Sequence, residues 1–374
     1  MSYPTVANSQ VTEAFHAVNL HQDVYQSLRQ PYSELPLDTI VSMLVADPEL
    51  ESRFDNDREL FELLMNKVRA TLAKALATDD DTALCLVHRT LFILLDMHVA
   101  SATSFAAANQ SNHYLQQMRN EIERAWLASG DSSPLARISA DMPLTDALRF
   151  LWSEHTVSNH PLFDYLETTA SHGQFVEFFR SDAALNIRFF DLIALILVGS
   201  DEITRKELVQ NLWDESGNGN STRSHVNLFR KLLDMVGAEN VEDNHASSLG
   251  WQGLAGHNLF MLTCLQRKHY FKAIGIMAIT ELLDPRQYEK LVHGCHRIGL
   301  GKEGEVDYYK EHISIDIVHA QGWLENVIVP LDAKYPEARA EILQGAMLRL
   351  NTCQDYYDAL LGMLQVHAPV AKQA

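Results

Sequence analysis

Apolar residues recur at helical intervals through nearly the whole sequence, and the apolar–polar alternation that marks a β-strand is scarce. The segment 57–77 shows this spacing most clearly, in the residues Leu60, Leu63, Leu64, Val68, Leu72 and Leu76. The acidic run 79–81 follows it and is well suited to cap another apolar helix. The pattern therefore predicts an all-α protein built as a helical bundle.

Breaks rich in glycine, proline or polar residues divide the chain. The strongest linker candidate is 128–134, which reads Ala-Ser-Gly-Asp-Ser-Ser-Pro. It predicts two domains, an N-terminal helical region of residues 1–135 and a larger bundle of residues 136–374. Further breaks are predicted near Gly199, over 215–224 and 237–253, at Asp284 and Pro285, and over 299–304. The last long helix should begin near Pro336, because proline is favoured in a first helical turn.

Charge and cysteine content narrow the classes of partner. The formal net charge of −19 disfavours nucleic acid and anionic membrane surfaces as partners. The longest apolar stretch, 189–199, contains Asp191 and is too short to cross a bilayer. No signal peptide is visible, and the four cysteines have neither metal-type nor disulfide-type spacing. We therefore expect a cytoplasmic protein with reduced thiols.

Three polar residues near the C-terminal end share one helical face. His312, Asp316 and His319 are spaced by four and three residues, and isoleucine and valine residues lie between them. A polar stripe with apolar flanks predicts a buried helix that presents two imidazoles and a carboxylate to an interior site. Such groups need hydrogen-bond partners or a metal, because burying them unpaired costs several kcal/mol. The triplet therefore predicts metal-centred chemistry.

Three further candidates fall on predicted apolar faces. Glu215 follows Leu208 and Leu212 at helical spacing, and His225 shares a face with Phe229. Glu281 lies on the same face as Ile274 and Ala278 in an apolar helix expected to end at Leu283. Each of these side chains should point inward.

The six candidates offer carboxylate oxygen and imidazole nitrogen, which suit iron or manganese. A bridging carboxylate can hold two such ions a few ångströms apart, whereas structural zinc is disfavoured without thiolates. On one unbroken helix, Glu215 and His225 would lie about 15 Å apart along the axis. The intervening Gly217 and Gly219 allow the chain to unwind and turn back. A dinuclear centre therefore requires this break.

Together these residues resemble the haem-oxygenase-like diiron oxidases and oxygenases, an iron-containing redox enzyme family related to the TENA and pyrroloquinoline-quinone-synthase fold. The resemblance is carried by 214–220, 224–229, Glu281 and the His312-x3-Asp316-x2-His319 triplet, and it covers roughly residues 140–370. Residues 1–135 are similar to the helical dimerisation region of the N-oxygenase of streptozotocin biosynthesis. No β-rich segment of the cupin type follows residue 330.

The resemblance implies a haem-oxygenase-like bundle that binds two Fe(II)/Fe(III) ions. The implied ligands are Glu215, His225, Glu281, His312, Asp316 and His319. It also implies O2 as cosubstrate, a small-molecule substrate, an external electron donor and a homodimer formed through the N-terminal helices. Some N-oxygenating members add a seventh carboxylate from an earlier core helix, and the nearest candidate here is Asp191. The glycines at 299, 301 and 304 would allow the triplet helix to move.

Three functions stay open. The first is an O2-dependent N-oxygenation of a small amine or amino-acid derivative. The alternative is desaturation or oxidative C–C cleavage of an amino acid or fatty acid at the same metal centre. The third is a metal-free, thiaminase-type enzyme that would use Cys295, but this leaves all six candidate ligands unexplained.

Other motifs have ordinary structural interpretations. His293 and His296 flank a glycine without a partner motif, and the Glu-x-x-His sequence at 242–245 lies in a polar stretch rather than an apolar helix. Trp213 and Trp323 flank candidate ligands at helical distance, and core packing is the default expectation for both.

Overall fold

The computed structural model describes residues 32, 34–130, 133–238, 249–302 and 304–366. Throughout these residues the regular structure is helical and no strand occurs, which confirms the all-α prediction. The chain divides into two compact units, Met1–Ile122 and Glu123–Ala374. This division falls inside a helix, whereas the sequence predicts a boundary near residue 135, and the predicted domain limits stay a prediction. None of the described helices is long and apolar enough to cross a membrane.

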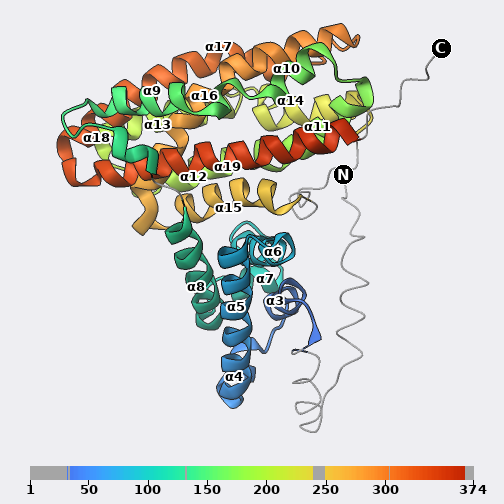
Figure 1. Cartoon of the computed structure of the whole chain (residues 1–374), viewed down its shortest axis with the longest axis vertical. Coiled ribbons are helices and arrows are strands. Elements are labelled where there is room, and N and C mark those ends of the chain that lie inside the picture. Colours follow the sequence, from blue (N-terminus) through green and yellow to red (C-terminus); the bar gives the residue numbers. More distant parts are fainter. Residues whose placement is uncertain (1–31, 33, 131–132, 239–248, 303, 367–374) are drawn as a thin grey trace. The chain divides into compact units, whose positions relative to one another are not determined.

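The first unit is a small helical bundle (Figure 1). Its helices are α3 (Leu37–Val45), α4 (Leu50–Asn56), α5 (Arg58–Thr78), α6 (Asp81–Asp96), α7 (Phe105–Asn109) and the first part of α8 (His113–Ser129). α6 packs against both α3 and α5. The carboxylate of Asp57 caps α5, and that of Asp80 caps α6 by accepting from the Ala83 N–H over 2.8 Å. The acidic run 79–81 therefore acts as the predicted cap.

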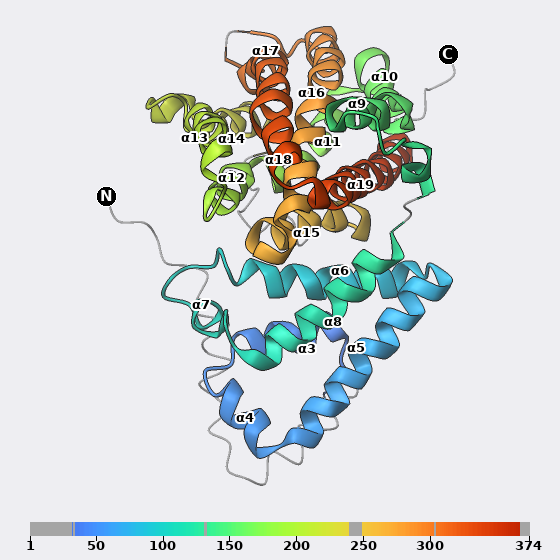
Figure 2. The same cartoon turned by 90° about the vertical axis from the view of Figure 1, so that its left-hand side faces the viewer.

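The second unit contains the remaining helices. They are η1 (Ser133–Arg137), α9 (Leu144–Glu154), η2 (Thr156–Asn159), α10 (Pro161–Thr168), α11 (His172–Asn186), α12 (Phe189–Leu197), α13 (Glu202–Glu215), η3 (Ser221–Arg223), α14 (His225–Met235), α15 (Trp251–Leu265), η5 (Arg267–His269), α16 (Tyr270–Arg297), α17 (Asp307–Gly322), the π-helical η6 (Trp323–Ile328), α18 (Val329–Lys334), η7 (Pro336–Ala338) and α19 (Arg339–Val366). The long helix α16 packs along both α17 and α19 (Figure 2). A Cβ at Gly275 of α16 would lie 1.9 Å from the Ile342 carbonyl oxygen, so α16 and α19 cross in direct backbone contact.

The predicted helix break at Asp284 and Pro285 is wrong. α16 runs through Pro285 without interruption, from Tyr270 to Arg297. Proline has no N–H, so the Glu281 carbonyl loses its intrahelical donor at this point. Beyond the proline, Tyr288 and Leu291 are buried, and packing of this second half offsets the local cost of the proline.

The helix that carries the triplet buries the three polar residues and exposes two of the apolar residues beside them. His312, Asp316 and His319 are buried as predicted, but Ile317 and Val318 of α17 are 58% and 62% exposed. The expectation that the apolar flanks share the burial is therefore wrong for these two residues. The triplet itself, rather than an apolar stripe, faces the interior of the unit.

Candidate metal centre

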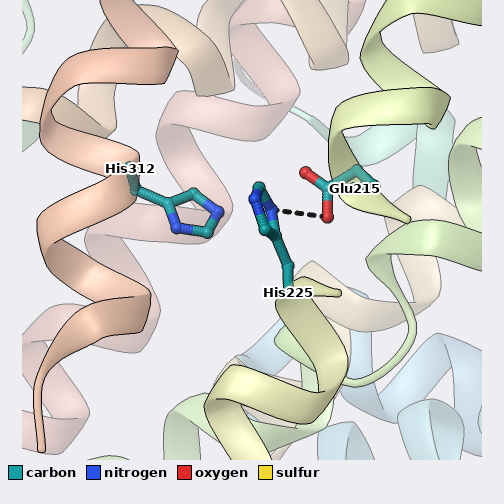
Figure 3. A group of neighbouring side chains, drawn as sticks. All are labelled: Glu215, His225 and His312. Carbon is teal, nitrogen blue, oxygen red and sulfur yellow. Dashed lines mark ion pairs between the residues drawn. The ribbon is translucent and has the colours of Figure 1, made fainter. Parts of the chain in front are cut away.

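Three of the predicted ligands form a first group, from the end of α13, the start of α14 and the middle of α17 (Figure 3). Glu215, His225 and His312 are all buried and offer ligand atoms that lie within 4.8 Å of one another. His225 lies between the other two, with its Nδ1 2.9 Å from Oε2 of Glu215 and its ring centroid 4.3 Å from that of His312. Nδ1 of His312 bonds the Tyr308 carbonyl oxygen over 2.7 Å, so Nε2 of His312 is the nitrogen available to the group.

A glycine turn brings Glu215 and His225 together. α13 ends at Glu215, and Gly217 and Gly219 have φ values of +78° and +83°. A Cβ at Gly217 would lie 2.4 Å from the Asn220 carbonyl oxygen, so only glycine fits there. Ser224 then caps α14, whose first residue is His225. The prediction that the chain unwinds and turns back between the two residues is confirmed.

The other three predicted ligands form a second group, from α16 and α17. Glu281, Asp316 and His319 are buried, again with ligand atoms within 4.8 Å of one another. Nδ1 of His319 lies 3.5 Å from Oε2 of Glu281 and 3.9 Å from Oδ1 of Asp316. The Asn211 amide donates to Oε1 of Glu281 over 3.2 Å, which helps to fix that carboxylate. All six candidates thus lie in the two groups, and their binding of metal stays a prediction.

Sequence reasoning missed Asp214. Its Oδ2 lies 3.1 Å from Nε2 of His319, on the far side of the ring from Glu281 and Asp316. A carboxylate in this position holds a histidine proton on Nε2 and leaves Nδ1 free for a metal. Asp214 precedes Glu215 and lies about 100° away around the helix, so a search of the inward face passes over it.

Burial and mutual repulsion govern the titration of these groups. Burial, together with the neighbouring His225, lowers the pKa of His312 well below its usual value. Burial and the nearby carboxyl of Glu281 raise the pKa of Asp316 well above its usual value. Burial opposes the protonation of His319, but the carboxylates around it, chiefly Glu281, raise its pKa to about 9. The carboxyl groups of the second group thus lie close enough to repel one another.

The two groups face one cavity. Glu215 and His312 of the first group and Glu281 and Asp316 of the second all contribute to its wall. His312 and Asp316 are also one turn apart on α17, so the groups are immediate neighbours. This arrangement would allow two ions to bind side by side next to a shared cavity.

The donor set fits iron. Oδ2 of Asp316 is buried without a hydrogen-bond partner among the described residues, and Nδ1 of His225, although 2.9 Å from Oε2 of Glu215, is not aligned for a hydrogen bond. Buried polar atoms are normally paired, so these two atoms are oriented for a ligand that is not protein. Two imidazole and carboxylate sets without thiolate match the preference of non-haem iron.

The remaining sequence candidates lie elsewhere. Asp191 belongs to neither group, since its side chain is 42% exposed and pairs with Arg188 over 3.4 Å. His293 is exposed and pairs with Glu167 over 3.0 Å, and the motif at 242–245 lies outside the described residues. Burial raises the pKa of the Cys295 thiol to about 12, which makes it a poor nucleophile. Trp323 is fully buried as expected, whereas Trp213 is 52% exposed, contrary to expectation.

Comparison with known proteins identifies the family of the segment that carries both groups. Residues 176–353 match the family model described as iron-containing redox enzyme, of the haem-oxygenase type. This segment belongs to that family. All six candidate ligands lie within the matched residues of this family of iron-containing redox enzymes.

No curated protein matches the chain. Among solved structures, the chain is similar to a CADD-like protein of unknown function from Nostoc punctiforme. The two are 20% identical with a TM-score of 0.46, and the alignment covers 59% of this chain and 96% of that chain.

Proposed function

We propose that the two groups bind two iron ions as one dinuclear centre and that the protein is a non-haem diiron oxygenase. The observation that carries the proposal is the pair of three-ligand groups, Glu215–His225–His312 and Glu281–Asp316–His319, beside one cavity. Bound iron would supply the electrons that activate O2, a reaction that protein side chains alone do not perform. Membership of an iron-containing redox family supports the metal.

Within this family we propose N-oxygenation of a small amine or amino-acid-derived substrate. Conversion of an amine and O2 to a hydroxylamine and water consumes two electrons and two protons. Two ferrous ions hold two electrons, so each further turnover needs an external reductant. Oxidation of a small substrate requires that bulk water be kept from the reacting atoms.

The cavity wall is suited to this task. Phe163, Phe178, Tyr288 and Tyr356 line it together with the two groups. Aromatic side chains offer a substrate an apolar surface and restrict the entry of water. Polar side chains outside the two groups, among them Asp284 and Arg349, also line the cavity.

The test is oxidation of a substrate panel under ¹⁸O2. Protein loaded anaerobically with ferrous iron is mixed with amines, amino acids or fatty acids and then with labelled oxygen, and products are analysed by mass spectrometry. We expect ¹⁸O on nitrogen from at least one amine. Products that lack ¹⁸O on nitrogen and have lost two hydrogens or a C–C bond would instead support desaturation or cleavage.

Two variants serve as controls for the panel. His312→Ala removes a ligand of the first group and should abolish product formation. His293→Ala removes an exposed histidine that belongs to neither group and should leave product formation unchanged. Equal activity of wild type and His312→Ala would contradict the proposed centre.

A further inference from the structure

A buried arginine lies in the cavity beside the two groups. Arg349 of α19 is 7% exposed and lines the same cavity as Glu281 and His312. Its Nε donates to Oγ1 of Thr280 over 3.1 Å, and its guanidinium carbon lies 4.8 Å from the ring centroid of Phe260. Within the described part of the chain, the bond to Thr280 is the one hydrogen bond that this guanidinium makes.

Arg349 forms no direct ion pair with any carboxylate that the structure describes. A guanidinium keeps its proton in proteins, and a buried cation without an anionic partner destabilises the fold. Asp284 lines the same cavity and acts on the charge of Arg349 electrostatically, but among the described residues no carboxylate lies within ion-pair distance of the guanidinium. The two terminal nitrogens of the guanidinium therefore remain for a ligand. Their planar, forked arrangement matches the two oxygens of a carboxylate.

Arg349 lies near the end of the cavity that is formed by the two groups of candidate ligands. Its partner Thr280 directly precedes Glu281 on α16, and adjacent Cα atoms are about 3.8 Å apart. A carboxylate held by Arg349 would thus lie close to the second group.

We propose that Arg349 binds the carboxylate of the substrate, so that the cavity selects small molecules with a free carboxylate, amino acids among them, over neutral amides and simple amines. This inference rests on the proposed function, because the two iron-binding groups define the end at which oxidation occurs. Arg349 is then a specificity-determining residue, and the guanidinium fixes which end of the substrate reaches the iron.

The test compares each L-amino acid of a standard panel with its primary amide. Dissociation constants are measured by calorimetry for wild type, Arg349→Lys, Arg349→Gln and the matched control Arg339→Gln. Arg339 lies on the same helix but pairs with Asp332 over 3.2 Å, outside the cavity. Binding is measured on iron-loaded and on metal-free protein, and circular dichroism and iron content are recorded for every sample.

We expect at least one acid to bind wild type about 10- to 100-fold more tightly than its amide, as a charge-assisted contact predicts. This ratio should fall to near one in Arg349→Gln, stay intermediate in Arg349→Lys and be unchanged in Arg339→Gln. An equal affinity of wild type for all acids and their amides would overturn the inference. The inference would also be overturned if folded Arg349→Gln kept the preference for the acid over its amide. The same holds if folded Arg349→Lys kept the full wild-type preference. Absence of iron binding with a normal acid–amide ratio would refute the proposed function alone.

Discussion

Oδ2 of Asp214 lies 3.1 Å from Nε2 of His319, while the next residue, Glu215, belongs to the other group. The last turn of α13 thus contacts both candidate iron sites through consecutive side chains. Displacement of this turn would alter a ligand of the first group and the orientation of a ligand of the second. The end of α13 is therefore a second structural link between the two sites, in addition to α17.

Replacement of Asp214 by alanine should weaken the second iron site selectively. Loss of the carboxylate that orients a metal-binding histidine typically costs about 10- to 100-fold in affinity. Anaerobic titration with ferrous iron should show one site near wild-type affinity and one weakened site. Gln210→Ala is the matched control, because Gln210 bonds the same carboxylate over 3.1 Å without contacting a candidate ligand. Two unchanged sites in Asp214→Ala would contradict the assigned role.

Gly217→Ala should disrupt the first site more than a comparable glycine substitution elsewhere. Gly237 has a similar φ of +74°, but a Cβ there meets no atom within 4 Å, whereas at Gly217 it meets the Asn220 carbonyl oxygen at 2.4 Å. Gly237→Ala should cost about 1–2 kcal/mol for the left-handed backbone alone. Gly217→Ala should cost more in urea unfolding and should also weaken iron binding. Equal losses in the two variants would show that the close approach at Gly217 is unimportant.

The carboxylate of Asp201, at the start of α13, should make the free energy of unfolding depend on pH. Hydrogen bonds from Lys334 and Tyr335 lower the pKa of Asp201 to about 2, and Asp201 also caps α13 at the Ile203 N–H. Because its folded pKa lies below the unfolded value of about 3.9, Asp201 stabilises the fold above that value and loses this contribution as pH falls toward 2. Asp201→Asn should therefore cost up to about 1 kcal/mol at pH 7, because asparagine keeps the helix cap but loses the charge that pairs with Lys334. That difference from wild type should shrink between pH 5 and pH 3.

Chemical denaturation at several pH values measures this effect. Glu202→Gln removes a charge from the same helix end without touching Lys334 and serves as the control. A cost of Asp201→Asn that is constant from pH 7 to pH 3 would be inconsistent with the depressed pKa.

Spacing alone predicted the parts of the site that obey helical geometry. His312, Asp316 and His319 share one face at any helical register, and the glycines after Glu215 required a turn whatever the tertiary structure. Both predictions hold because they depend on local backbone geometry. The chemistry of the ligand set followed from residue types and family resemblance rather than from the fold.

Tertiary packing decided what the sequence left undetermined. Pro285 is a strong local helix breaker. Nevertheless, α16 continues through it, because the helix is packed against the core both before and after the proline. Ile317 and Val318 are exposed because the side of α17 that carries His312, Asp316 and His319 takes the interior position. Arg349 could not be distinguished in sequence from a solvated charge, since the residues that it contacts lie on α15 and α16, far from it along the chain.

The central claim is that the two groups hold two irons as one centre. Iron analysis and X-ray absorption spectroscopy of protein loaded anaerobically with ferrous iron, before and after exposure to O2, test it most directly. We predict two irons per chain, an iron–iron distance of about 3.5–4 Å and oxidation of both ions by O2. One iron or none per chain, or two irons without an iron–iron vector, would contradict the dinuclear centre.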